Sequence, residues 1–242
     1  MITRDIAPDA VADLALDPPR AALASVVDDE IFLLPVEVTL DTPSDPAEST
    51  RVVRVRDCAP DLGGHNVVVV ADDGPQWFRL RSLTVRGTAA AVGDNTYRVA
   101  PRRVVAWDYG SLREVSSPGS AKPQSAHSRR VPSDLPPLRS AKLEAALGNS
   151  HVMIVATRSR KGTPFAVPLW FIVHDDRIYA ATAASSWTVR NAIDCPQVCM
   201  LFGGERGQGG DRLLVRGHAQ AITEFPPATV LARTAWRYYL RP

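Results

Sequence analysis

The chain has 242 residues, of which 45% are hydrophobic and 22% charged, a composition typical of a globular protein with one large domain or two small ones. The formal net charge of +2 indicates neither a nucleic-acid nor an anionic-membrane partner. The segment Met1 to Asp17 lacks the apolar core of a signal peptide, and no later run approaches the ~18 apolar residues of a membrane-spanning helix. We therefore expect a cytoplasmic protein.

The cysteines and histidines do not indicate a disulfide framework or a metal site. Cys195 and Cys199 lack the second pair of ligands that a zinc site needs, and Cys58 is far from both in the sequence. None of the five histidines has the spacing of a metal ligand set. We expect three buried thiols and no metal.

In the first half, the sequence predicts one helix followed by strands. Asp17-Pro18-Pro19 predicts a helix over Arg20 to Val26, because proline is tolerated in the first turn of a helix. Residues 41–49, with two prolines, are expected to form a loop. Runs of β-branched and aromatic residues between turn residues predict strands at Glu30 to Leu40, Arg51 to Arg56, Asn66 to Ala71, Trp77 to Val92 and Tyr97 to Tyr109.

The composition changes between Val115 and Ser133 to Ser, Pro, Lys, Arg, Gln and His, with almost no apolar residues. Such a segment is typical of a solvated linker. We therefore expect an N-terminal domain over residues 15–114 and a C-terminal domain over residues 134–242.

The second half begins with a predicted helix, Leu138 to Leu147, which Gly148 and Asn149 are expected to end. A strand from His151 leads into a meander, and Ser186 then opens a helix as its N-cap. Because the amides at a helix N-terminus favour an anion, this start is a candidate phosphate site. The strands are expected at His151 to Thr157, Thr163 to Val173, Arg177 to Thr182, Gln197 to Phe202 and, after a Gly-rich loop, Arg212 to Ile222.

The two halves look like copies of one another. Leu83 to Val92 matches Leu213 to Ile222 with Arg86 against Arg216 (216 − 86 = 130), and Trp107 matches Trp236 at nearly the same offset (236 − 107 = 129). We expect Arg86 and Arg216 to be repeated ion-pair or hydrogen-bond anchors, and Trp107 and Trp236 to be packing anchors where the halves meet. A fold that works as a homodimer can be fused into one chain, so the copies predict two packed β-barrel domains related by a pseudo-two-fold axis.

Several motifs of the second half follow one another in a fairly specific order: a Val-Ala-Thr strand, a Gly-x-Pro turn, Val-Pro-Leu-Trp-Phe, Tyr-Ala-Ala-Thr, Ser-x-x-Val-Arg-Asn, Pro-x-Val and Val-Arg-Gly-x-Ala. This order resembles the pyridoxamine 5′-phosphate oxidase-like, FMN-binding split β-barrel superfamily, including its deazaflavin-dependent branch. The resemblance covers residues 138 to 223, and the first half only through its Val-Arg-Gly strand. It implies a mainly β protein with short helices, built as two tandem split β-barrels with a flavin at the interface between them.

The resemblance also implies a cofactor site. A flavin ring would lie along Val167, Pro168, Leu169 and Trp170, with its phosphate at Thr182 and Ser186, and Arg190 and Asn191 match the end of the helical motif. Members of the family often carry Lys where this chain has Thr188, and loss of that cation would cost ~1–3 kcal/mol of phosphate binding. The first copy has no Ser-led helix, so we expect a single ligand site per chain, in the second half.

Two functions remain open from the sequence. The first is an FMN- or deazaflavin-dependent oxidoreductase that acts on a small organic substrate, in which the cofactor supplies the redox chemistry. The second is a non-catalytic protein that holds flavin, haem or another planar ligand on the same scaffold, because a fold does not decide a function. In either case the fused halves are expected to act as an intramolecular pseudo-dimer, with further homodimerisation possible.

Overall fold

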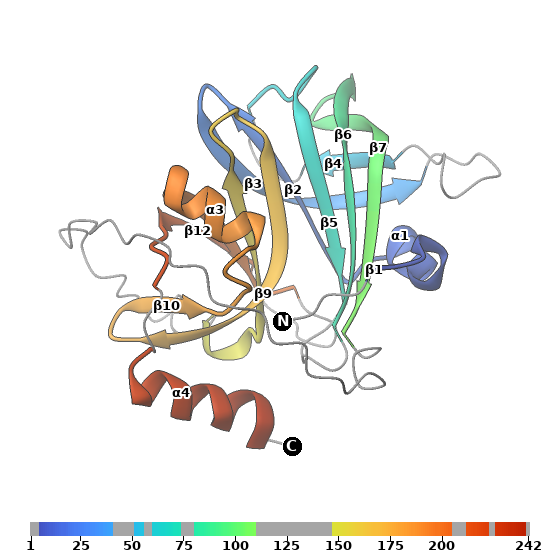
Figure 1. Ribbon diagram of the computed structural model, residues 1–242. Helices are drawn as coiled ribbons and strands as arrows, with labels where there is room; N and C mark the ends of the chain where they lie inside the picture. Colours follow the sequence, from blue (N-terminus) through green and yellow to red (C-terminus); the bar gives the residue numbers. More distant parts are fainter. Residues whose placement is uncertain are drawn as a thin grey trace.

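The computed structural model describes residues 5–40, 51–55, 60–73, 80–109, 147–204, 212–222 and 226–240. Within them the chain forms two antiparallel β-sheets, one from each half, and a few short helices (Figure 1). The expected mainly β architecture is confirmed. The expected loop at 41–49, the linker at 115–133 and most of the helix at 138–147 lie outside these residues. No helix of the described part is both long and apolar enough to cross a membrane.

The first half is a closed barrel of six strands in the order β7-β4-β3-β2-β5-β6, with β6 pairing back onto β7. Alternate side chains, among them Leu23, Val69 and Val85, fill its interior. The elements of this half are β1 (Asp5–Ile6), η1 (Pro8–Val11), α1 (Ala12–Leu16), β2 (Arg20–Val27), β3 (Glu30–Leu40), β4 (Arg51–Val55), β5 (Asn66–Asp72), β6 (Arg81–Gly93) and β7 (Thr96–Asp108).

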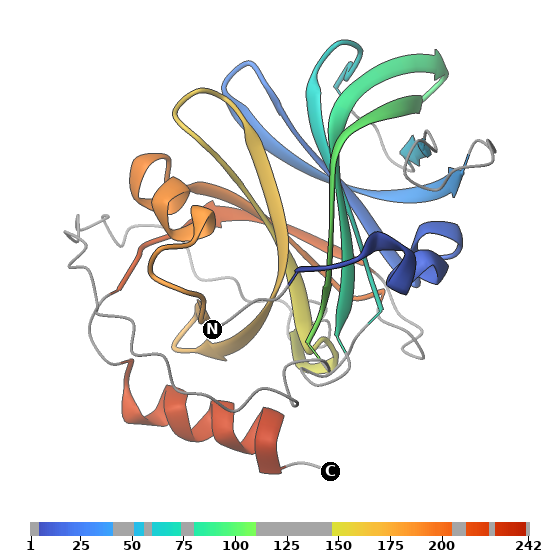
Figure 2. The same ribbon diagram turned by 45° about the vertical axis from the view of Figure 1, so that its right-hand side comes forward.

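The second half is an open half-barrel of five strands in the order β10-β9-β8-β11-β12. Among its described residues no sixth strand closes the sheet, and two helical segments follow β12 instead, below the second sheet in Figure 2. Its elements are β8 (Val152–Arg158), β9 (Pro164–His174), β10 (Arg177–Ala180), α3 (Trp187–Asp194), β11 (Gln197–Phe202), β12 (Leu213–His218), α4 (Ala228–Ala235) and the π-helical η4 (Trp236–Leu240).

The helix expected over Arg20 to Val26 is wrong, because these residues form strand β2. Alanine and leucine favour a helix locally, but here Ala21 and Leu23 face the barrel interior while Ala22 and Ala24 face the second half. A strand buried on both faces reads as a continuous apolar run, so its sequence has no alternation to reveal it. The short helix of this region is α1, which ends before the two prolines.

Other boundaries move by a few residues. β10 ends at Ala180, so Thr182 lies in the following loop, and β12 ends at His218 rather than Ile222. β6 is described from Arg81, and residues 74–79, which hold the expected start of this strand, lie outside the described part. The helix at the start of the second half continues through Asn149 instead of stopping at Gly148.

Strand register confirms the duplication. Both sheets contain the same four-strand core, β3-β2-β5-β6 in the first half and β9-β8-β11-β12 in the second. The difference in residue number between corresponding residues of the two copies grows by one from strand to strand. It is 130 at the arginines, then 199 − 68 = 131 and 156 − 24 = 132. Neighbouring residues on the first core are Arg86, Val68 and Ala24, and their counterparts on the second are Arg216, Cys199 and Ala156.

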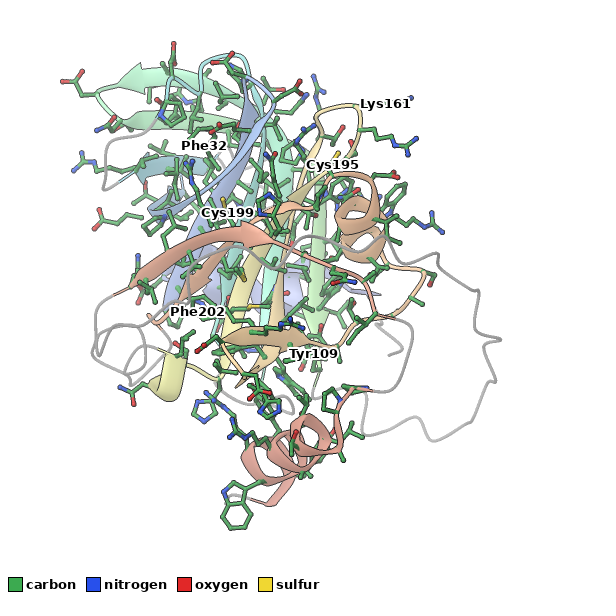
Figure 3. All side chains as sticks on the ribbon, turned by 90° about the vertical axis from the view of Figure 1, so that its left-hand side faces the viewer. Phe32, Tyr109, Lys161, Cys195, Cys199 and Phe202 are labelled. Atoms are coloured by element: carbon green, nitrogen blue, oxygen red, sulfur yellow. The ribbon has the colours of Figure 1, made fainter. Side chains whose placement is uncertain are left out.

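The hairpins between the first two core strands account for one further residue of offset. β2 and β3 are joined by Asp28 and Asp29, both with positive φ (49° and 63°), as a two-residue hairpin requires. β8 and β9 are joined by a longer turn in which Gly162 has φ 72° and the Ser159 amide donates to the carbonyl oxygen of Thr163. The counterpart of Phe32 on β3 is therefore Phe165 on β9 (165 − 32 = 133). Figure 3 shows Lys161 at the tip of the longer hairpin.

The halves meet through a shared core. Ala22, Leu33 and Val68 of the first half pack against Ile154 and Leu201 of the second. Figure 3 shows Cys199 near Phe32, and the Cys199 thiol donates to the carbonyl oxygen of Ile31 at 3.1 Å. Cys195 and Cys199 are both free and buried, as expected. The two domains are thus packed as a pseudo-dimer, as the sequence predicts.

A buried ion pair crosses the same junction. Arg20 and Asp72 are paired at 2.8 Å, with side chains that are 0% and 1% exposed. Arg20 also donates to the carbonyl oxygens of Val152 at 2.8 Å and Gly203 at 3.4 Å, in the second half. By register, Val152 and Gly203 are the counterparts of Arg20 and Asp72 (152 − 20 = 132 and 203 − 72 = 131). The pair therefore ties one copy to the backbone of the other at corresponding positions.

The two matched tryptophans are not structural counterparts. Trp107 lies on β7 and packs with Tyr109 against Val152 and Trp170, so it is a packing anchor between the halves. Trp236 begins η4 and is 63% exposed, so the same expectation is wrong for it. The short Ala-Trp match ends a strand in one half and a helix in the other.

Candidate functional site

The segment between β10 and β11 forms the helix start that the sequence indicated. Ser186 is the N-cap of α3, and its Oγ accepts a hydrogen bond from the Val189 amide at 3.3 Å. The amides of the first helical turn, at Trp187 and Thr188, have no acceptor within the helix. Such a helix start attracts an anion through these amides and through the helix dipole.

Four side chains are layered beside this helix start. The rings of Phe165 on β9 and Trp187 on α3 are stacked, with centroids 5.5 Å apart and planes at 18°. The Arg190 guanidinium lies 5.3 Å from the Trp187 ring, and that of Arg86 lies 4.6 Å from the Phe165 ring. Arg86 comes from β6, so the first half contributes a cation to a cluster that is otherwise built by the second.

Arg86 is a half-buried cation without a negatively charged partner among the described residues. Its guanidinium makes no ion pair with any described residue, and its buried Nε has no hydrogen-bond acceptor there. Burial lowers the pKa of Arg86, and so does the charge of Arg103, which lies directly opposite on β7. The hydroxyl of Thr88, two residues further along β6, is also buried without a partner in the described part of the chain. The arrangement would be stabilised by an anion.

The corresponding junction on the other side of the pseudo-two-fold axis is neutralised. The guanidinium of Arg216 on β12 lies 4.7 Å from the ring of Phe32. This contact is the pseudo-two-fold counterpart of the Arg86–Phe165 contact. Here, however, the guanidinium is 3.5 Å from the carboxylate of Glu30. Residues 60–65, between β4 and β5, form turns where α3 stands in the second half. The expectation of an ion-pair or hydrogen-bond anchor is therefore confirmed for Arg216, whereas Arg86 has neither kind of partner among the described residues.

The four residues expected along a ligand ring lie on β9 but do not share one face. Val167 and Leu169 point into the core of the half-barrel, while Pro168 alternates with them and is buried on the opposite face. β10 pairs only with Phe171 to His174, so the edge of β9 at residues 164–170 has no strand partner in the described sheet. Backbone amides and carbonyls along such an edge are available to a ligand.

Trp170, the fourth of these residues, is covered by the C-terminal segment. Its ring stacks on that of Tyr238 in η4, with centroids 4.7 Å apart and planes at 8°. The Tyr238 hydroxyl oxygen accepts from the Phe171 amide at 3.2 Å and lies 2.7 Å from the carbonyl oxygen of His151. Arg237 donates to the carbonyl oxygens of Leu147 and Ser150, which fastens the same segment to the start of β8. In this arrangement Trp170 is a packing residue.

The remaining predicted residues lie in α3 or in the loop before it. Thr182 is half-buried in the loop before the helix, and Thr188 is half-buried in its first turn. Arg190 is exposed over Trp187. Asn191 is buried and donates from Nδ2 to the hydroxyl of Thr157 at 3.1 Å, so it fixes the helix to β8. The structure thus places Ser186, Thr188, Arg190 and Asn191 in the cap and first turns of α3, while Thr182 lies in the loop before it and Trp170 lies at the far end of β9.

Sequence reasoning missed three members of the cluster: Arg86, Phe165 and Trp187. The only signal in the sequence was the Val-Arg-Gly match between the halves. It singled out Arg86 but did not indicate which residues its side chain contacts. Its partner Phe165 lies 79 residues away in the sequence (165 − 86) and in the other half, and no local pattern indicates such a contact.

By fold, the protein consists of a six-stranded barrel and a half-barrel that share a duplicated four-strand core. Residues 140–241 match the family model described as pyridoxamine 5′-phosphate oxidase. This match covers the motifs that carry the resemblance seen in the sequence, so the resemblance is confirmed for this part of the chain.

Among solved structures, the chain is similar to one described as the FAD binding protein from Mycobacterium smegmatis, at 18% identity and a TM-score of 0.35. The match covers 44% of this chain and 97% of that chain. Comparison with curated proteins found no match.

Proposed function

We propose that this protein binds a flavin between its two halves, with the phosphate at the start of α3, and that it is an FMN- or deazaflavin-dependent oxidoreductase of small organic molecules. The observation that carries the proposal is the layered cluster of Arg86, Phe165, Trp187 and Arg190 beside the Ser186 cap. It combines two cations and a helix N-terminus in one place, which suits an anionic ligand. The family of residues 140–241 supports the same ligand class.

The residues present fit the group. The amides of Trp187 and Thr188, together with the guanidinium group of Arg86 or that of Arg190, would hold the phosphate end. The unpaired edge of β9 from Phe165 toward Leu169 would offer backbone donors and acceptors to the ring. A flavin or deazaflavin, when bound, supplies the hydride or electron transfer, so the chain itself has to bind, orient and shield.

The alternative is a non-catalytic protein that binds flavin, haem or another planar ligand. One observation favours it: the ring of Trp170 already stacks on Tyr238, so this tryptophan does not present an open surface for a substrate. The absorption spectrum of the purified protein separates the two. Flavin bands that bleach on reduction and recover with a substrate support the oxidoreductase, and a Soret band supports the haem-binding alternative.

The site is tested by fluorescence titration of FMN into the wild-type chain and two variants. Ser186→Ala removes the helix cap and should weaken FMN binding. Thr188→Lys adds a cation in the first helical turn and should tighten it, by about tenfold for each ~1.4 kcal/mol gained. We expect one FMN per chain. A stoichiometry of two, or equal affinities for all three proteins, would contradict the placement of the site.

A further inference from the structure

We infer that Arg86, a residue of the first half, is the principal cation for the anionic end of the ligand bound by the second half. The inference rests on the proposed function and adds to it: the site is incomplete without the first copy. None of the family motifs in the second half includes this residue, and its sequence pattern alone indicates a structural anchor.

The segment that starts α3 carries no cation of its own. Residues 182–189 read Thr-Ala-Ala-Ser-Ser-Trp-Thr-Val, without a single basic side chain. Partial charges of the helix amides alone bind a phosphate weakly in water, so a full positive charge has to come from elsewhere. The two guanidinium groups in contact with the Phe165–Trp187 stack are those of Arg190, which is exposed, and Arg86, which is half-buried.

Arg86 is held in place without being neutralised. The Phe165 ring supports one face of its guanidinium at 4.6 Å, which restricts the side chain but supplies no negative charge. Its buried Nε has no acceptor among the described residues, and neither does the hydroxyl of Thr88. An anion that bridges these two groups would supply the missing acceptor and the missing charge together.

The like charge opposite strengthens this conclusion. Arg103 lies across from Arg86 in the β6–β7 ladder, and like charges directly opposite each other destabilise a sheet. A phosphate bound beside both guanidinium groups would offset the repulsion between them, because each would be attracted to the same anion.

The pseudo-symmetric junction provides an internal comparison. Arg216 has the same position and the same phenylalanine contact, but Glu30 lies 3.5 Å from it. The counterpart of Glu30 beside Arg86 is Thr163 (163 − 30 = 133), which carries no charge. Among the described residues, Arg216 has a carboxylate beside it and Arg86 has none, and Arg86 is the one that contacts the Phe165–Trp187 stack, which includes a residue of α3.

The test compares Arg86→Gln with the matched variant Arg216→Gln, using FMN and riboflavin, which lacks the phosphate. Arg86→Gln should raise the Kd for FMN at least about tenfold and leave the Kd for riboflavin unchanged, while Arg216→Gln should alter neither. Arg86→Lys should restore part of the FMN affinity, because it keeps the charge but not the planar fork. Circular dichroism and thermal unfolding establish that each variant is folded.

The outcomes distinguish this inference from the proposed function. If the wild-type protein binds FMN and Arg86→Gln binds it equally well, the inference is overturned and the flavin site stands. If the wild-type protein binds neither flavin, the proposed function fails, and calorimetric titration with inorganic pyrophosphate decides the inference. Binding that Arg86→Gln abolishes and Arg216→Gln keeps supports an anion site at Arg86, and no binding overturns it.

Discussion

The two halves share a four-strand core in the same register, and they differ in what surrounds it. In the first half, β4 and β7 complete a closed barrel, while in the second the described sheet is open and α3, α4 and η4 pack around it (Figure 1). Core strands pair residue by residue, so their register tolerates no insertion, whereas the connections at their ends can change length and structure. The copy with the open sheet is therefore the one that carries the helix start of the candidate site.

The same contrast appears at the two arginine contacts that cross the junction. Both arginines lie over a phenylalanine of the opposite half, which is what a pseudo-two-fold axis requires. The difference between them is one carboxylate, Glu30, at the contact without a helix. A symmetric scaffold has thus become asymmetric in charge, and charge decides where an anionic ligand binds.

The largest expected effect is on the ion pair that exists in the first copy only. Asp72→Asn leaves Arg20 buried without its charged partner, and breaking a buried pair in this way should lower the free energy of unfolding by about 3–5 kcal/mol. Urea denaturation measures the change. Asp13→Asn is the matched control, because Asp13 pairs with Arg81 on the surface at 2.7 Å and should contribute only about 0.2–1 kcal/mol. Equal losses in the two variants would contradict the role of the buried pair.

The next largest effect is the pH dependence of the free energy of unfolding that Tyr109 confers. Tyr109 is buried against Val152 of the other half, and burial raises its pKa to about 12. An unfolded tyrosine ionises near pH 10, so this contribution to stability is complete below about pH 10 and is lost as the pH rises to about 12. Urea denaturation at a series of alkaline pH values measures the loss. Tyr109→Phe has no group to ionise there, and an equally steep decline in that variant would exclude Tyr109 as the cause.

The two equivalent glycines should respond differently to a methyl group. Gly87 lies where β7 carries an extra residue, and a side chain there would collide with the carbonyl oxygen of Ala100. Gly87→Ala should therefore cost about 1–3 kcal/mol through overpacking. At Gly217 an added Cβ would meet only the Met200 side chain at 3.6 Å, an ordinary contact, so Gly217→Ala should change stability by less than about 0.5 kcal/mol. Thermal unfolding ranks the two, and a larger loss at Gly217 would contradict this account.

The smallest effect is expected from removing the carboxylate of the neutralised junction. Glu30→Gln breaks an exposed pair with Arg216 and should lower the free energy of unfolding by less than about 1 kcal/mol. Because α3 has no counterpart in the described loop at residues 60–65, the variant should still bind one FMN per chain. Calorimetric titration measures the stoichiometry. A second equivalent of FMN would mean that charge alone distinguishes the two junctions.

Much of the candidate site was predictable from local patterns. Strand β3 and strand β11 have the expected bounds, and Ser186 caps its helix as its residue type indicates. Each of these features depends on residues a few positions apart: alternation, turn glycines and a hydroxyl three residues before the amide it bonds. The order of these motifs also indicated the superfamily, because it reflects the order of strands in one half.

The sequence by itself determined the strands, the turns, the duplication and the cap of α3, because period-two alternation and capping act within one segment. Only the tertiary structure decided that residues 20–27 form a strand, since burial on both faces overrides the helix preference of alanine and leucine. Only the tertiary structure placed Arg86 on Phe165 and Tyr238 on Trp170. Those contacts join residues that are far apart in the chain, the first between the two halves and the second within the second half.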